Sequence, residues 1–180
     1  WIIAFLMCYG LMYAGNLIGT ALTFGIGMVK GTGVDNPMVS TVMQLNPWVT
    51  FVIAVLIAPT AEELLFRKLL TERIVKYGEL PAVLASGLFF GLFHGNLNQF
   101  VYAAALGAFF AFIYVRTGKI RYTMILHAMV NSMATIGTLL LKLLSVGTDG
   151  YLQGTEMLTL VSSPDLYGLL RDPLSGVMYL

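Results

Sequence analysis

The sequence has very few charged residues for its length. Asp, Glu, Lys and Arg make up 11% of its 180 residues, whereas about 25% is usual in soluble globular domains. A water-facing surface needs roughly 25–35% charged residues to stay dispersed. The low charge therefore excludes a soluble domain, a disordered chain and a nucleic-acid-binding module. Together with 58% hydrophobic residues, it predicts a multi-pass integral membrane protein.

Cysteine and histidine are also scarce. Cys8 is the single cysteine, so it cannot form a disulfide within the chain and offers no metal-binding cysteine spacing. The two histidines, His94 and His127, both fall in predicted membrane helices, where an ionisable side chain is costly and usually functional. The chain begins with Trp1 rather than Met, and we treat it as a candidate fragment of a longer protein.

Long apolar stretches predict an all-α bundle of about five membrane helices, since a spanning helix needs roughly 20 apolar residues. We expect them near residues 1–28, 48–77, 81–94, 99–116 and 122–145. Pro59 is expected to kink the second helix. The chain then divides into an N-terminal helix and loop (1–47), a catalytic four-helix core (48–145) and a tail at the interface or outside the membrane (146–180).

Basic residues orient the predicted bundle. The loop between the third and fourth helices has no Lys or Arg, so the positive-inside rule places the opposite ends of the second and fourth helices in the cytoplasm. The same basic residues are expected to contact anionic lipids. The residues that carry this signal are Lys68, Arg73, Lys76, Arg116, Lys119 and Arg121.

Several polar side chains lie inside the predicted spans, where they usually face the bundle interior. Glu63 and Arg67 are four residues apart on one helix face and can form an ion pair. His127 and Asn131 have the same spacing and can point at one spot. The full set is Glu62, Glu63 and Arg67 in the second helix, His94 in the third, and His127 and Asn131 in the fifth.

This set of side chains suits hydrolysis. Glu62 can accept a proton from water, and the two imidazoles can orient water, donate to an oxyanion or bind a metal. The Asn131 amide can donate to a developing oxyanion. Phe90 shares a helix face with His94, so its ring can form a wall of the site. The structural alternatives are a buried ion pair at Glu63 and hydrogen bonds that join helices.

Three motifs in order carry a family resemblance: Glu62-Glu63-x-x-x-Arg67, Phe90-x-x-x-His94 and His127-x-x-x-Asn131. Together they resemble the family of CAAX prenyl endopeptidases and bacteriocin-processing enzymes, called CPBP or Abi. The resemblance covers about residues 48–145. It implies an all-helical intramembrane endopeptidase with its site between the second, third and fifth helices, and the compact chain is similar to bacterial members, which implies a bacterial cytoplasmic membrane. The basic end of the second helix favours a site near the cytoplasmic face.

The resemblance also implies residue roles. Glu62 would be the general base, with His94 helping to activate water. His127 and Asn131 would stabilise the oxyanion, while Glu63 and Arg67 hold the geometry. The substrate would be a peptide or a membrane-anchored protein, in some cases lipid-modified.

Two questions stay open at this point. Glu62, His94 and His127 could bind zinc, but the sequence has no H-E-x-x-H motif, so we favour a glutamate mechanism without a metal. The rival functions are a non-catalytic immunity or peptide-binding protein that uses the same cavity, and a proton-coupled transporter with these residues as a relay.

Overall fold

The computed structural model describes residues 1–31 and 46–147. Helices and turns make up these residues, without a strand among them, which confirms the all-α prediction. Every predicted helix end lies within two residues of an observed end. The predicted loop at 32–45 and the tail from 148 onward lie outside the described residues. In chain order the elements are α1 (Ile2–Lys30), α3 (Pro47–Phe51), η1 (Val52–Ile57), α4 (Ala58–Glu63), η2 (Leu64–Thr71), α5 (Glu72–Ile74), η3 (Val75–Tyr77), α6 (Glu79–Phe93), α7 (Leu97–Thr117) and α8 (Ile120–Gly147).

The outer surfaces of the helices are apolar. Three of the described helices, at Ile2–Lys30, Trp48–Tyr77 and Leu97–Thr117, are long and apolar enough to cross a membrane, and α6 is a shorter apolar helix. On α6, Leu84, Leu88 and Leu92 are exposed, whereas Ser86 and Phe90 are buried. An apolar outer face with small and polar residues inside is the pattern of helices packed in lipid. The chain is therefore an integral membrane protein.

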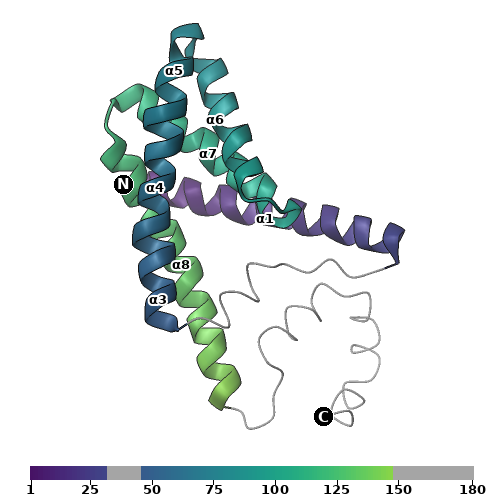
Figure 1. Ribbon diagram of the computed structural model, residues 1–180. Helices are drawn as coiled ribbons and strands as arrows, with labels where there is room; N and C mark the ends of the chain where they lie inside the picture. The colour runs from purple at the N-terminus through teal and green to yellow at the C-terminus, as the bar shows by residue number, and fades with distance from the viewer. Residues whose placement is uncertain (32–45, 148–180) are drawn as a thin grey trace.

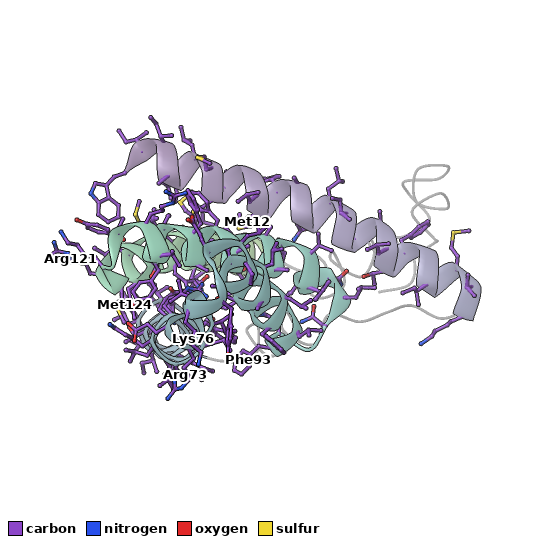
Figure 2. All side chains as sticks on the ribbon, turned by 90° about the horizontal axis from the view of Figure 1, so that it is seen from above. Met12, Arg73, Lys76, Phe93, Arg121 and Met124 are labelled. Atoms are coloured by element: carbon purple, nitrogen blue, oxygen red, sulfur yellow. The ribbon has the colours of Figure 1, made fainter. Side chains whose placement is uncertain are left out.

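The segments α3 to α5 form one long rod, and α8 runs beside it (Figure 1). Helix α1 runs crosswise to this rod in the same view, and it lies along one side of the remaining helices when the molecule is seen from above (Figure 2). Helix α7 packs against both α1 and α6 in the two most extensive helix contacts. The buried apolar core has two parts, one between α1, α7 and α8 and a smaller one between η2, α6 and α7.

Small residues allow these helices to approach closely. A Cβ on Gly15 would lie 2.5 Å from the Cα of Tyr102, so α1 packs directly on α7 at this glycine. A Cβ on Gly87 would lie 2.6 Å from the carbonyl oxygen of Ala104, which sets the approach of α6 to α7. Gly107 leaves room in the same way for Phe90. Close backbone approach of this kind is how membrane helices gain packing energy.

Pro59 does not end the long rod. It lies in the short helix α4, which has a π-helical segment on each side, η1 and η2. In η2, the hydroxyl of Thr71 donates to the carbonyl of Phe66, five residues earlier, at 2.7 Å. π-Helical turns are rare and occur mainly at functional sites. Here they flank the segment that carries Glu62 and Glu63.

Candidate active site

Glu63 and Arg67 form a fully buried ion pair, as their spacing predicted. Arg67 Nε and Nη2 donate to the two carboxylate oxygens of Glu63 at 2.9 and 3.0 Å, and both side chains have 0% exposure. Arg67 Nη1 also donates to the hydroxyl of Ser86 on α6 at 3.0 Å. A two-pronged pair with a third hydrogen bond holds Glu63 in one orientation.

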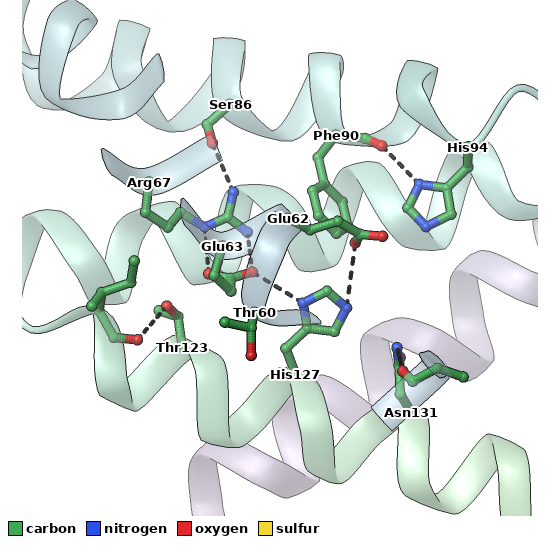
Figure 3. Close-up of polar contacts among 12 residues, drawn as sticks. Thr60, Glu62, Glu63, Arg67, Ser86, Phe90, His94, Thr123, His127 and Asn131 are labelled. Carbon is green, nitrogen blue, oxygen red and sulfur yellow. Dashed lines mark hydrogen bonds and ion pairs between the residues drawn. The ribbon is translucent and has the colours of Figure 1, made fainter. Parts of the chain in front are cut away.

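His127 on α8 lies between two carboxylates. Its Nδ1 is 3.1 Å from Oε1 of Glu63, and its Nε2 is 3.7 Å from Oε2 of Glu62. Because Glu63 is an ionised partner of Arg67, its carboxylate accepts a hydrogen bond from the N–H at Nδ1, and Nε2 faces Glu62. Figure 3 shows both contacts on opposite sides of the ring.

The two adjacent glutamates have different surroundings. The Glu62 side chain is 18% exposed, whereas Glu63 is 0% exposed. Glu63 is held by Arg67 and His127, while the contact of Glu62 with His127 is longer. Glu62 is therefore the carboxylate with oxygen atoms free to reach a water or a substrate.

His94 lies at the end of α6, on the same side of the site as Glu62 (Figure 3). Its Nδ1 is 2.9 Å from the carbonyl of Phe90, and since a carbonyl can only accept, Nδ1 carries the proton. In the neutral ring, Nε2 is then the acceptor. Asn96 fixes the turn after His94: its Nδ2 donates to the His94 carbonyl at 3.1 Å, and its Oδ1 accepts from the N–H of Gln99 at 2.9 Å.

Asn131 lies one turn after His127, as predicted, but its amide has a backbone partner. Its Nδ2 donates to the carbonyl of Ala54 in the long rod at 2.8 Å. The sequence predicted that this amide donates to an oxyanion, and it did not predict the contact with Ala54. The Asn131 Nδ2 group carries two hydrogens, and only one of them is used in the bond to Ala54.

Aromatic rings enclose the imidazole of His127. Phe90 and Phe110 lie with ring centres 5.6 and 5.4 Å from that of His127. Phe90 also lies 5.1 Å from His94, so it forms the wall beside this imidazole that its spacing predicted. Sequence reasoning missed Ser86 and Phe110. Ser86, Phe90 and His94 are four residues apart on one stripe of α6, and this spacing was the signal for Ser86.

The described residues do not fit a bound metal ion. Among residues 1–31 and 46–147, no three His, Cys, Asp or Glu side chains gather in a way that could hold one. No catalytic step is therefore derived through a metal, and the preference for a metal-free glutamate mechanism stays a prediction.

An apolar groove of about 540 Å³ lies between η2 and α6. Phe66 in its wall contacts Phe90 edge-on, with ring centres 5.0 Å apart. The rings of Phe66 and Phe90 therefore lie between the groove and the two imidazoles. Its lining residues are Leu65, Phe66, Leu69, Leu70, Phe89, Leu92 and Phe93.

The chain is similar in sequence to known proteins. Residues 44–133, which include both glutamates and both histidines, match the family described as type II CAAX prenyl endopeptidase Rce1-like. The chain belongs to this family. It is also 30% identical over 114 residues to the Bacillus subtilis (strain 168) protein named "Putative membrane peptidase YdiL".

The chain spans less than half the length of this relative. The match covers 63% of the chain and 45% of the Bacillus protein. No solved structure matches the chain. Family membership therefore rests on the sequence of the segment that contains the three motifs. The structure adds the contacts of His127 with Glu62 and Glu63.

Proposed function

We propose that this chain is an intramembrane endopeptidase in which Glu62 activates a water molecule for attack on a peptide bond. The observation that carries the proposal is the arrangement of two adjacent glutamates on one imidazole. Glu63 is buried and fixed by Arg67, whereas Glu62 keeps its oxygen atoms accessible beside Nε2 of His127. A fixed carboxylate that orients a histidine, next to a free one that can accept a proton, is suited to acid–base catalysis.

The steps follow from these positions. Glu62 takes a proton from water as the water oxygen attacks the carbonyl carbon, and His94 Nε2 accepts the second hydrogen bond of that water. In its doubly protonated form, with Nδ1–H on Glu63, His127 donates its Nε2–H to the oxyanion and keeps both protons through the step. The amide hydrogen of Asn131 that does not bond to Ala54 is a second donor. The proton on Glu62 then passes to the leaving nitrogen as the C–N bond breaks, which returns the carboxylate to its starting state.

The substrate class follows from the surroundings of the site. The side chains that line the groove beside Phe66 are all apolar, which suits a lipid tail or an apolar peptide segment rather than a polar one. We propose a membrane-anchored peptide or protein as the substrate, cut near the cytoplasmic face of a bacterial cytoplasmic membrane. The basic ends of the second and fourth predicted helices support this orientation.

A cleavage assay in detergent tests the proposal. The purified protein is incubated with fluorogenic peptides, with and without a C-terminal lipid, and compared with Glu62→Gln and with Glu79→Gln. Glu79 forms an exposed ion pair with Arg116 and serves as the matched control. Glu62→Gln should lower kcat by about 100-fold or more, whereas Glu79→Gln should cleave normally.

The outcomes separate the rival functions. Wild-type cleavage by Glu62→Gln would end the assignment of Glu62 as the base. If wild type and Glu62→Gln bind the peptides equally and neither cleaves, the immunity or peptide-binding function is the better explanation. Peptide-independent proton uptake in vesicles would favour the transporter.

A further inference from the structure

The backbone carbonyl of Ala54 has no donor within its own helix. At the end of η1, the N–H of Ala58 bonds to the carbonyl of Ile53, five residues earlier. The next residue, Pro59, has no N–H. In an α-helix the Ala54 carbonyl would accept from the N–H of residue 58, and in a π-helix from the N–H of residue 59. The first N–H is bonded to Ile53 and the second does not exist, so neither donor reaches Ala54.

Asn131 supplies the missing donor from another helix. Its Nδ2 donates to the Ala54 carbonyl at 2.8 Å, across 77 residues of sequence. Pro59 is fully buried, and a backbone carbonyl without a hydrogen-bond donor is costly inside a membrane protein. The contact therefore ties α8 to the turn that precedes Glu62.

The long rod is thus held to α8 on both sides of Pro59. Before Pro59, Ala54 bonds to Asn131, and after it, Glu63 bonds to Nδ1 of His127 at 3.1 Å. Asn131 and His127 are one turn apart on α8. The wide π-helical turn also sets the rotation of the rod, because one residue more or fewer in a turn rotates the following side chains by about 100°.

We propose that Pro59, Ala54 and Asn131 form a lock that positions Glu62 against His127, and that Asn131 acts as a positioning residue besides any contact with the oxyanion. The inference rests on the proposed function, because it concerns how the base is held. It explains why a buried proline lies three residues before the base. It also gives the Asn131 amide a role before any substrate binds.

Pro59→Ala tests the lock without touching Asn131. The substitution returns an N–H to the helix, so Ala54 no longer needs Asn131. We expect kcat to fall by about 10-fold or more as Glu62 moves, with a smaller change in KM. The Tm should stay equal or rise, because alanine favours the helix far more than proline. If Asn131 served the oxyanion alone, Pro59→Ala would keep the wild-type kcat.

Pro81→Ala is the matched control. Pro81 lies in the first turn of α6, where the N–H of a residue has no acceptor within the helix. Replacing this proline should change neither the rotation of a helix nor the partner of a carbonyl. We expect kcat and Tm close to those of the wild type.

A double-mutant cycle with Asn131→Ala measures the contact itself. In the wild-type background, Asn131→Ala should lower the Tm by roughly 3–9 °C, because the partly buried Ala54 carbonyl loses its hydrogen-bond donor. In the Pro59→Ala background the loss should be less than half as large. Ser132→Ala is the control, since Ser132 donates to Ala128 in its own helix at 2.7 Å, and its effect should be the same in both backgrounds.

Three results would overturn the lock: equal Tm losses for Asn131→Ala in both backgrounds, wild-type kcat in Pro59→Ala, or a Pro59→Ala protein that does not fold. The last result counts because the substitution returns a helix hydrogen bond. The Tm cycle requires no substrate. Absence of cleavage by the wild type would therefore end the proposed function, and the Tm cycle would still decide on the lock.

Discussion

Removing the guanidinium of Arg67 should strongly destabilise the protein. Arg67 makes three hydrogen bonds, two to Glu63 and one to Ser86, and neither member of the ion pair is exposed. Arg67→Met would leave the Glu63 carboxylate buried without its cation. Breaking one partner of a buried pair costs about 3–5 kcal/mol. In a chain of this size that loss corresponds to a fall in Tm of roughly 6–20 °C.

A second substitution should restore much of the lost stability. In Glu63→Gln/Arg67→Met no buried charge is left from the pair, and replacing both partners of a buried pair is often close to neutral. We expect the double variant to recover at least half of the lost Tm. It should still cleave poorly, because a neutral amide orients His127 less firmly than a carboxylate does.

The assay is thermal unfolding in detergent micelles, with Arg116→Met as the control. Arg116 pairs with Glu79 at 2.7 Å, but the two side chains are 63% and 36% exposed. An exposed pair contributes about 1 kcal/mol or less, so the control should lose at most a few degrees in Tm. The reasoning is refuted if Arg67→Met costs no more than Arg116→Met, or if the double variant is as unstable as the sum of its single variants.

Three further predictions concern packing and chemistry. Gly87→Ala should lower the Tm by several degrees, because the new Cβ would lie 2.6 Å from the Ala104 carbonyl oxygen. The control Gly25→Ala should be neutral or stabilising, since its new Cβ meets nothing within 4 Å. Equal Tm values for the two variants in thermal unfolding would contradict the packing argument. His94→Gln should lower kcat by about 100-fold and leave the Tm nearly unchanged, and a wild-type rate in the peptide assay would remove His94 from the chemistry. Treatment with a strong chelator should leave cleavage intact after metal analysis of the sample, and activity that is lost and returns with added zinc would replace the glutamate mechanism by a metal-dependent one.

The sequence by itself determined the features that depend on one helix at a time. The shortage of charge identified a membrane protein, and the apolar runs placed every described helix end within two residues. The ion pair of Glu63 and Arg67 could be predicted because residues four apart always share a helix face. For the same reason Phe90 could be placed beside His94.

The tertiary structure alone decided which helix faces meet. It selected Glu63 rather than Glu62 as the carboxylate on Nδ1 of His127, 64 residues away, and it directed Asn131 to the Ala54 carbonyl. Periodicity fixes the direction of a side chain about its own helix axis. The rotation of one helix against another depends on how closely their backbones approach at small residues and on the π-helical turns beside Pro59, and a pattern within one helix does not contain that information.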